Sequence, residues 1–381
     1  MSRVVFAGGG TGGHLYPALA LAEALRVEAP DVSVHFVGAR RGVEARVLPQ
    51  KGLPFTLLPI EPVSRAHPLR NWRVLPALAR SVGAVARLFG SFRPQLVVGT
   101  GGYASAPACL WAVVRRIPLA LQEQNAWPGA TTRLLARRAR QVHLGFPEAE
   151  RHLRIGPATR VFALGNPIRR SDGAPDRAAA RERHGLRTGA VAALVVGGSQ
   201  GSLALNETLI GALEATSAGT LPPLPDTAQL LWATGPSHIE VVRARLAPLG
   251  FGPRVVAVPY IDDMESALQA VDLALSRAGA MTTAELLAAG VPALLVPLPT
   301  AAADHQTRNA EALAEAGAAV CVPESALTPE RLWTELVALI GDGARRERMA
   351  ASARERARPD AARDIARALL TLLPADARGV S

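Results

Sequence analysis

Residues 3–26 read RVVFAGGGTGGHLYPALALAEALR, and this stretch decides the fold class. Its first part, Arg3–Ala7, is rich in β-branched and aromatic side chains, which predicts a short buried strand. The glycine-rich loop GGGTGGH follows at 8–14, and the apolar stretch behind it, with Pro17 near its first turn, predicts a helix to Arg26. A strand, a glycine loop and a helix in this order are typical of an α/β fold with a parallel sheet.

The same arrangement begins again in the second half of the chain. Val191–Val196 predicts another buried strand, and GGSQG at 197–201 leads into a helix-compatible segment. Further strand candidates alternate with helical stretches at Val32–Val37, Gln95–Gly99, Pro118–Leu121, Val255–Val258, Val271–Leu275 and Ala293–Val296. We expect Arg170–Arg187 and Pro359–Leu373 to be helical. Because 381 residues exceed the usual size of one domain, we predict an α/β protein with two doubly wound parallel sheets.

The charge of the chain suggests an anionic partner. Its formal net charge is +10 and its pI is near 11.0, which fits nucleic acid, a phosphate-bearing substrate or an acidic lipid surface. Aromatic side chains make up only 4% of the residues and no nucleic-acid-binding signature is present, so we expect no nucleic acid. Cys109 and Cys321 do not suggest a disulfide framework. No Asp-x-Asp pair is present to clamp a metal–diphosphate complex, so we expect no metal.

Both glycine loops suggest phosphate binding. A helix N-terminus exposes unpaired N–H groups and a partial positive charge, and glycine lets phosphate oxygens approach them. The loop also fits the Gly-x-Gly-x-x-Gly pattern of dinucleotide sites, with Gly8, Gly10 and Gly13. Just beyond the second predicted strand stand Arg40 and Arg41, which could bind the 2′-phosphate of NADPH. An NADPH-dependent oxidoreductase is therefore an alternative, as are tight turns that bind no ligand.

A third segment, SRAGAMTTAE at 276–285, follows a predicted strand and enters a helix. Its backbone N–H groups and threonine hydroxyls could bind a diphosphate. Glu285 lies one turn into this helix, and its carboxylate could accept two hydrogen bonds from a ribose diol. The alternative is that the helix dipole simply favours an acidic residue at this position.

Eight short motifs together carry a resemblance to a known family. They are GGGTGGH from Gly8, GTGGYASAP from Gly99, QEQN from Gln122, GNPIR from Gly165, GGSQG from Gly197, YIDDM from Tyr260, SRAGAMTTAE from Ser276 and DHQTRNA from Asp304. In order and spacing they resemble the MurG family, the UDP-N-acetylglucosamine:N-acetylmuramyl-(pentapeptide) pyrophosphoryl-undecaprenol N-acetylglucosamine transferases, over most of the chain. One departure is Gln122, where the family commonly has histidine, so no role of that imidazole can be transferred to this chain.

The resemblance implies a GT-B fold, in which two Rossmann-like doubly wound parallel-sheet domains face an interdomain cleft. Residues 1–165 would form an N-terminal acceptor and membrane-associating domain. Residues 166–354 would form the C-terminal UDP-sugar-binding domain, and a helix at about 355–375 would pack back on the N-terminal domain.

The resemblance also implies the site residues. Ile261 would lie near uracil and Glu285 on ribose, with Gln306 and Asn309 on the sugar hydroxyls. The other residues that would bind UDP-N-acetylglucosamine are Thr11, Gly12, Gly13, Asn125, Arg169, Ser199, Ala280, Met281, Thr282, Thr283 and Ala284. The acceptor-side residues would be Gly10, Gly101, Gly102, Tyr103 and Ser105.

The implied reaction is an inverting transfer of N-acetylglucosamine to the C4 hydroxyl of undecaprenyl-pyrophosphoryl-N-acetylmuramyl-pentapeptide (lipid I), which gives lipid II for peptidoglycan synthesis. A base must accept the hydroxyl proton. His14 is the first candidate because imidazole titrates near neutral pH, and Glu123 is the second. No cofactor is implied. Another GT-B glycosyltransferase with a lipid or natural-product acceptor stays an alternative, because it would share the donor half.

A lipid-linked substrate implies a membrane-facing patch and a peripheral location on the cytoplasmic face of the cell membrane. Residues 62–94 are the candidate contact with an anionic membrane surface. Arg73, Arg80 and Arg87 recur every seven residues and would share one helical stripe. An apolar stripe would run beside them, formed by Leu75, Leu78, Val82, Val85 and Phe89. The alternative is an ordinary amphipathic helix that packs on its own sheet.

Overall fold

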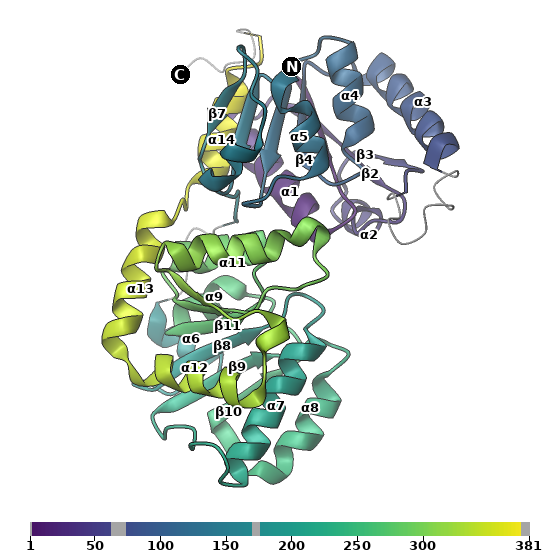
Figure 1. The fold of residues 1–381 in the computed structure, drawn as a ribbon. Coiled ribbons are helices and arrows are strands. Elements are labelled where there is room, and N and C mark those ends of the chain that lie inside the picture. Colours follow the sequence, from purple (N-terminus) through teal and green to yellow (C-terminus); the bar gives the residue numbers. More distant parts are fainter. Residues whose placement is uncertain (1, 62–73, 170–175, 375–381) are drawn as a thin grey trace. The chain divides into compact units, whose positions relative to one another are not determined.

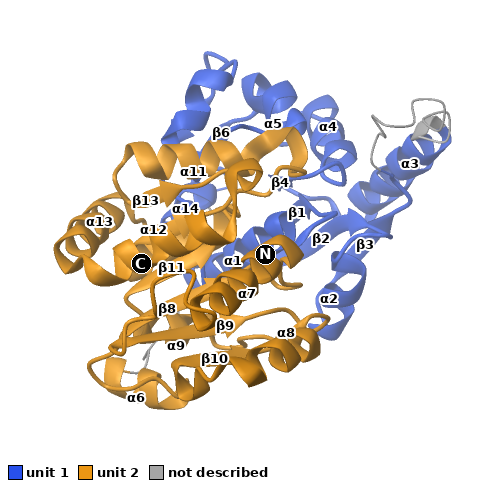
Figure 2. Cartoon of the chain, turned by 60° about the horizontal axis from the view of Figure 1, so that its bottom comes forward, with its two compact units in different colours: residues 1–169, 359–381 blue, residues 170–358 orange. Residues whose placement is uncertain are grey.

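The structure is a computed structural model, and it describes residues 2–61, 74–169 and 176–374. The chain forms two compact units, shown in different colours in Figure 2. Unit 1 contains residues 1–169 and 359–381, and unit 2 contains residues 170–358. The chain therefore leaves unit 1 once and returns to it in its last segment.

In the described part of unit 1, seven parallel strands form one sheet in the order β3-β2-β1-β4-β5-β6-β7. The strands are β1 (Arg3–Gly8), β2 (Ser33–Ala39), β3 (Phe55–Leu58), β4 (Leu96–Gly101), β5 (Leu119–Glu123), β6 (Gln141–Leu144) and β7 (Arg160–Phe162). The helices, drawn in Figure 1, are α1 (Gly12–Glu28), α2 (Glu44–Gln50), α3 (Val74–Phe92), α4 (Ala106–Val114), α5 (Ala130–Leu135) and α14 (Ala361–Leu370), with 3-10 turns at Ala136–Arg138 and Pro147–His152. The strand order reverses between β1 and β4, and ligands of such sheets bind beside this point at the carboxyl ends of the strands.

The sheet of unit 1 is covered on both faces, and β1 shows how the sequence permits this. Val4 and Phe6 lie in a core with α1, α2 and α14, whereas Val5 and Ala7 lie in a core with α3, α4 and α5. Successive side chains of a strand point to opposite faces, so a strand covered on both sides needs an unbroken apolar run. The predicted doubly wound parallel sheet is confirmed here.

Helix α14 packs against α1, although the two helices stand at opposite ends of the sequence. Arg367 Nε lies 2.9 Å from a carboxylate oxygen of Glu28. Gln141 Nε2, on β6, donates to Ala368 O at 3.0 Å. Ile365 is fully buried in the core that α1 shares. The last helix thus completes the core of unit 1.

In the described part of unit 2, six parallel strands form a second sheet in the order β10-β9-β8-β11-β12-β13. The strands are β8 (Val191–Val196), β9 (Ala228–Ala233), β10 (Val255–Val258), β11 (Leu273–Ser276), β12 (Ala293–Leu295) and β13 (Ala319–Cys321). The helices are α6 (Arg177–Arg183), α7 (Leu203–Ser217), α8 (Ile239–Leu246), α9 (Met264–Ala270), α10 (Ala280–Ala289), α11 (His305–Glu315), α12 (Pro329–Gly341) and α13 (Gly343–Arg356), with 3-10 turns at Ala247–Leu249, Gly252–Arg254, Ala302–Asp304 and Glu324–Ala326. The order reverses between β8 and β11, and this sheet confirms the second half of the predicted fold class.

Five strands were not predicted from the sequence, namely β3, β6, β7, β9 and β13. In β6 the reason is visible, because Gln141 and His143 are buried polar residues that interrupt the apolar pattern. Burial lowers the pKa of His143 to about 4, so its imidazole is neutral in the core. A hydrogen bond of 3.1 Å joins His143 Nε2 to Gln141 Oε1. Paired polar side chains therefore occupy core positions that periodicity assigns to apolar ones.

Helix α3 bears on the two interpretations of residues 62–94. Residues 62–73, with Arg73, lie outside the described residues. Further along the helix, Val85 and Phe89 are buried in the core against the sheet, whereas Arg80 and Arg87 are exposed. In this described part of the helix, Val85 and Phe89 pack on the protein's own sheet, and Arg80 and Arg87 face outward. Among the helices in the described ranges, none is long and apolar enough to cross a membrane.

Candidate functional site

The first glycine loop ends β1 and opens α1. Thr11 is the N-cap residue, with an extended backbone at φ −139° and ψ 162°, and its side chain makes no capping hydrogen bond. The N–H groups of the first helical turn, including those of Gly12 and Gly13, therefore have no side-chain cap. Gly10 has φ +94°, a conformation that glycine adopts without strain. The loop thus presents an uncapped helix N-terminus, which suits an anion.

A buried carboxylate, that of Glu44, holds this loop. Its two oxygens accept from Gly10 N at 2.9 and 3.0 Å, and Oε1 also accepts from Ala39 N at 2.6 Å. A Cβ atom at Gly9 would lie 2.0 Å from Glu44 Oε1, and one at Gly42 would lie 2.3 Å from it, so only glycine fits at both positions. The sequence did not reveal Glu44, because it stands at the start of an ordinary helix and its loop partner lies 34 positions away.

His14 lies where two glycine loops of unit 1 meet. Its Nδ1 lies 3.1 Å from Thr100 O and 3.0 Å from Gln124 Oε1. Gly101 and Gly102 have φ values of +90° and +75°, and a Cβ atom at Gly101 would lie 3.0 Å from His14 Nδ1. Within the described residues, Nε2 of His14 has no hydrogen-bond partner. The ring is half-buried, so Nε2 is the nitrogen left to meet a substrate.

Tyr103 and Ser105 follow the second of these loops but differ in access. The Tyr103 ring lies against Gly10, since a Cβ atom at Gly10 would be 2.7 Å from Tyr103 Cε1. Burial, and after it the nearby carboxylate of Glu44, raises the pKa of Tyr103, so the phenol stays a neutral donor. Ser105 is fully buried, and its Oγ donates to Gly102 O at 2.8 Å. Half-buried Tyr103 can meet a ligand, whereas Ser105 supports the loop.

The carboxylate of Glu123 is enclosed at the end of β5. Its side chain is buried, Oε2 accepts from Gly129 N at 2.9 Å, and Oε1 accepts from Asn125 N at 3.2 Å. Both oxygens thus hold the turn that follows the strand. Arg169 is exposed and forms an ion pair of 2.9 Å with Glu23.

In unit 2 a buried arginine joins three loops. Arg277 Nε and Nη2 donate to the Oγ of Ser202, the N-cap residue of α7, at 3.1 and 2.8 Å. Its Nη1 donates to Val296 O at 3.2 Å and to Pro297 O at 3.3 Å, and the guanidinium forms an ion pair with Glu324. The loops that follow β8, β11 and β12 are thereby tied together. Nothing local in the sequence marked Arg277, because these partners lie 19 to 75 positions away.

Helix α10 begins at the carboxyl end of β11 with an uncapped turn. Its N-cap residue, Gly279, has φ −66° and ψ 137° and no side chain to cap with. An α-helix supplies no carbonyl partner for the N–H groups of its first turn, and here these include those of Met281 and Thr282. Thr283 is fully buried, and its Oγ1 donates a hydrogen bond of 3.0 Å to the carbonyl oxygen of Ala280, the first helical residue. Ser199 is exposed in the loop after β8, and Ala284 is half-buried.

Glu285 stands one turn after this uncapped end and is half-buried. Among the described residues, its carboxylate has no hydrogen-bond or ion-pair partner. Burial raises the pKa of Glu285 to about 7. A ligand that donates hydrogen bonds to this carboxylate would compensate for its lost hydration, and a vicinal diol has that chemistry.

Two side chains from α11 hold the loop that leads into α10. Gln306 Oε1 accepts from Ala278 N at 3.2 Å and from Leu298 N at 3.0 Å. Asn309 is fully buried, and its Nδ2 donates to Ala278 O at 3.1 Å. Ile261 is buried just after β10. Within unit 2, the structure thus brings the predicted α11 residues to the start of α10.

The candidate residues fall into two groups, one at the glycine loops of unit 1 and one around α10 in unit 2. In the ranges that the structure describes, no group of three or more histidine, cysteine, aspartate or glutamate side chains is arranged to hold a metal ion. Each group contains a helix N-terminus without a side-chain cap. Each also contains a titratable side chain with atoms that have no hydrogen-bond partner among the described residues, namely Nε2 of His14 in unit 1 and the carboxylate oxygens of Glu285 in unit 2.

Comparison with known proteins places both units in one family of enzymes. Residues 4–144 match the glycosyltransferase family 28 N-terminal domain, and residues 192–365 match its C-terminal domain. A protein of Salinibacter ruber named UDP-N-acetylglucosamine--N-acetylmuramyl-(pentapeptide) pyrophosphoryl-undecaprenol N-acetylglucosamine transferase is 41% identical over 370 residues, which cover 97% of this chain and 96% of that protein. A protein of the same name from Syntrophotalea carbinolica is 41% identical over 353 residues, 92% of this chain and 94% of its own.

A solved structure agrees with these relatives. The crystal structure of MurG from Acinetobacter baumannii is 29% identical to this chain and has a TM-score of 0.75, covering 97% of this chain and 100% of that one. The expected GT-B fold is thereby confirmed, and glycosyltransferase domains replace the oxidoreductase interpretation of the first glycine loop. Because relatives at this level of identity span nearly its whole length, the chain belongs to the MurG family of glycosyltransferases.

Proposed function

We propose that this chain transfers N-acetylglucosamine from UDP-N-acetylglucosamine, with inversion, to the C4 hydroxyl of undecaprenyl-pyrophosphoryl-N-acetylmuramyl-pentapeptide. The product is the lipid-linked disaccharide precursor of peptidoglycan. The names of the two relatives describe this donor and this acceptor. The structural observation that carries the proposal is the uncapped N-terminus of α10 followed, one turn later, by the carboxylate of Glu285.

The proposed donor site lies in unit 2. The N–H groups at the start of α10 bind the diphosphate, and Ser199 approaches it from the neighbouring loop. Glu285 stands about 7 Å further along the helix axis, at ~1.5 Å per residue, where it can accept hydrogen bonds from the ribose hydroxyls. The backbone at Ile261 binds uracil, and Gln306 binds the sugar hydroxyls. Asn309 is bonded to the loop itself, which supports a positioning role for its side chain.

The proposed acceptor site lies in unit 1, at the loops that end β1 and β4. The backbone of Gly10, Gly101 and Gly102 permits close approach of the pyrophosphate, and the neutral phenol of Tyr103 can donate to it. For residues 11–13, Asn125 and Arg169, we retain the donor-side role that the resemblance implies.

His14 is the proposed general base. Its Nε2 removes the proton from the C4 hydroxyl while that oxygen attacks the anomeric carbon, and UDP leaves with the electrons of the broken C–O bond. Attack on the face opposite to UDP inverts the anomeric configuration. The partial positive charge at the N-terminus of α10 stabilises the negative charge that develops on the diphosphate. Glu123 is less suited as a base, because its carboxylate oxygens already accept backbone N–H groups.

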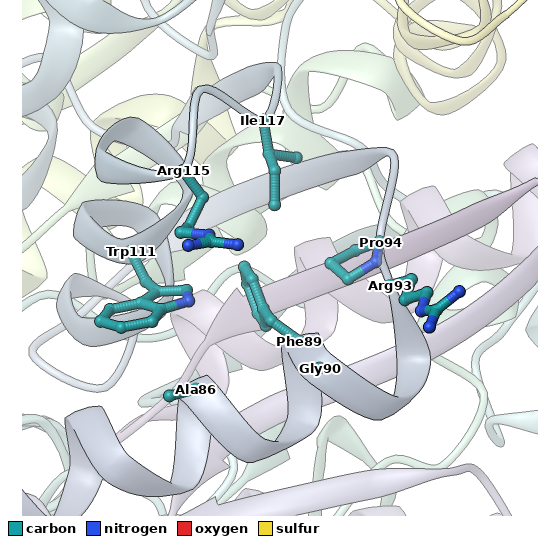
Figure 3. Close-up of a pocket in the computed structure, with 8 residues that line it drawn as sticks. All are labelled: Ala86, Phe89, Gly90, Arg93, Pro94, Trp111, Arg115 and Ile117. Atoms are coloured by element: carbon teal, nitrogen blue, oxygen red, sulfur yellow. The ribbon is translucent and has the colours of Figure 1, made fainter.

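We also propose that unit 1 associates peripherally with the cytoplasmic face of the membrane, near α3 and α4. A cavity of about 450 Å³ lies between the end of α3 and α4. Figure 3 shows the apolar side chains of Phe89, Trp111 and Ile117 in its lining, with the guanidinium group of Arg115 beside them and Arg93 next to Pro94 at the edge. Both arginines are exposed. Apolar surface next to exposed cations suits the headgroup region of an anionic bilayer.

The test is transfer of labelled N-acetylglucosamine from its UDP form to a short-chain lipid-linked muramyl-pentapeptide. Disaccharide formation that disappears in Glu285→Ala and persists in Glu335→Ala, a half-buried glutamate of α12, would support the reaction and the donor site together. Transfer only to diacylglycerol, offered in parallel, would refute the acceptor assignment. Oxidation of NADPH without sugar transfer would refute the function as a whole.

A further inference from the structure

Three buried amide side chains form a row that leads away from His14. Gln122 is the last but one residue of β5, Gln124 follows the strand directly, and Asn166 lies in the loop after β7. His14 Nδ1 lies 3.0 Å from Gln124 Oε1, Gln124 Nε2 donates to Gln122 Oε1, and Gln122 Nε2 donates to Asn166 Oδ1 at 3.1 Å. The four side chains therefore form one continuous hydrogen-bonded chain.

Backbone carbonyls fix which way the hydrogen bonds of this row run, at both of its ends. Gln124 Nε2 donates to Thr100 O at 2.8 Å and to Gln122 O at 3.0 Å, and a carbonyl oxygen can only accept. The amide nitrogen of Gln124 must therefore face these carbonyls, and its oxygen must face His14. At the other end, Asn166 Nδ2 donates to Gln124 O at 2.9 Å, which turns Asn166 Oδ1 toward Gln122. Each amide thus donates away from His14 and presents its oxygen toward it.

This direction decides which nitrogen of His14 carries the proton. Nδ1 faces two acceptors, Thr100 O at 3.1 Å and Gln124 Oε1 at 3.0 Å, and no donor. A neutral imidazole in this position must place its single proton on Nδ1, which leaves the lone pair on Nε2. The backbone of His14 is held as well, because Thr100 Oγ1 donates to His14 O at 2.8 Å.

We propose that Gln124, oriented by Gln122 and Asn166, is a positioning residue that holds His14 as the Nδ1–H tautomer and makes Nε2 the basic atom of the transfer. The last step rests on the proposed function, since it takes His14 as the base. All three amides are neutral, so the row orients the imidazole without placing a carboxylate against it. Gln122 is the middle link of the row, because it accepts from Gln124 and donates to Asn166.

The first experiment reads the tautomer directly. The protein is labelled with ¹⁵N-histidine, and its imidazole nitrogens are recorded by NMR at about pH 9, above the ordinary imidazole pKa of about 6.5. The chain has eight histidines, so the signals of His14 are identified by their loss in His14→Gln. We expect a protonated Nδ1 and an unprotonated Nε2. A protonated Nε2 in the wild-type protein would overturn the inference, whatever any variant does.

The second experiment removes the oriented acceptor. Gln124→Met keeps the length of the side chain but offers no amide oxygen, so the Nε2–H tautomer should gain population and turnover should fall about tenfold, the size of one lost hydrogen bond. The KM for UDP-N-acetylglucosamine should stay the same. Gln141→Met is the matched control, because Gln141 is also a buried glutamine of unit 1 whose amide donates to a backbone carbonyl. A Gln124→Met protein with an unchanged His14 spectrum and unchanged turnover would overturn the inference.

A third variant separates this inference from the proposed function. If His14→Ala keeps near-normal turnover, His14 is not the base and that part of the proposed mechanism fails. The positioning of the ring by Gln124 would still be supported by the wild-type spectrum. If His14→Ala is inactive while the wild-type spectrum shows Nε2–H, the base stands and the positioning inference is overturned.

Discussion

Replacing Glu285 with glutamine should stabilise the unliganded protein at pH 8 and have a much smaller effect at pH 5. Burial raises the pKa of this carboxyl from its ordinary value of 4.5 to about 7. The folded protein therefore binds the proton more tightly than the unfolded chain does. The stability that this group contributes is fully present below pH 4.5 and is lost as the pH rises through about 7.

The magnitude follows from the same pKa. At ~1.36 kcal/mol per pH unit, ionising the buried carboxyl costs about 3 kcal/mol at pH 8 and about 1 kcal/mol at pH 5. Glutamine carries no such cost. For a unit of this size, 1 kcal/mol corresponds to roughly 2–4 °C in Tm, so the variant should melt about 6–12 °C higher at pH 8.

The assay is thermal unfolding of the wild type and Glu285→Gln without ligand at both pH values, with Glu335→Gln on α12 as the control. For the control we expect the same difference from wild type at pH 5 and pH 8. UDP-N-acetylglucosamine should raise the Tm of the wild type more than that of Glu285→Gln, because glutamine offers the ribose diol one uncharged acceptor oxygen where the carboxylate offers two charged ones. A gain for Glu285→Gln that is equal at both pH values would refute the assignment of a buried, uncompensated carboxylate.

Four further results are expected. Arg277→Met should lower the free energy of unfolding by about 3 kcal/mol and weaken UDP binding at least tenfold, measured by denaturation and calorimetry. The reason is that half-buried Glu324 loses its cation and Ser202 and the carbonyls after β12 lose their buried donor. Gly102→Ala should lower turnover more than tenfold with donor binding retained, since a Cβ atom at this position would lie 2.1 Å from the carbonyl oxygen of Gly9. The control is Gly52→Ala, because Gly52 has a similar φ of +62° but lies in open space. Arg80→Glu with Arg87→Glu should reduce flotation with anionic vesicles, and unchanged flotation would favour a purely internal role for α3. Transfer should continue in excess chelator, because backbone N–H groups face the proposed diphosphate site, and a loss that magnesium restores would contradict this.

The fold could be predicted because its signals are local. In β1 and α1, the apolar strand, the glycine loop and the helix lie within 26 residues of one another, and each has its own periodicity. His14 and Glu285 could be proposed as site residues for the same reason, since each lies in a short segment that joins a predicted strand to a predicted helix. Strand β6 could not, because its buried polar side chains depend on partners such as α14 that arrive later in the chain.

The parts of the site that escaped prediction are those made by distant partners. Glu44 looks like a first-turn helix residue until β2 and β1 bring it to Gly10. Arg277 looks like a loop cation until its partners fold around it. Helix α3 shows another limit, because an amphipathic pattern reveals an apolar face but not what covers it. Val85 and Phe89 are covered by the core of unit 1.

The return of the chain to unit 1 at Pro359 has a consequence for biosynthesis. The ribosome makes α14 after the whole of unit 2, so residues 1–169 emerge without the helix that covers the apolar side of α1. Unit 2, continuous from 170 to 358, can fold as soon as it leaves the exit tunnel. Residues 1–169 are therefore made first, but their core is complete only once α14 has been made. A stop codon placed after residue 358 should leave unit 2 folded and unit 1 open to proteases.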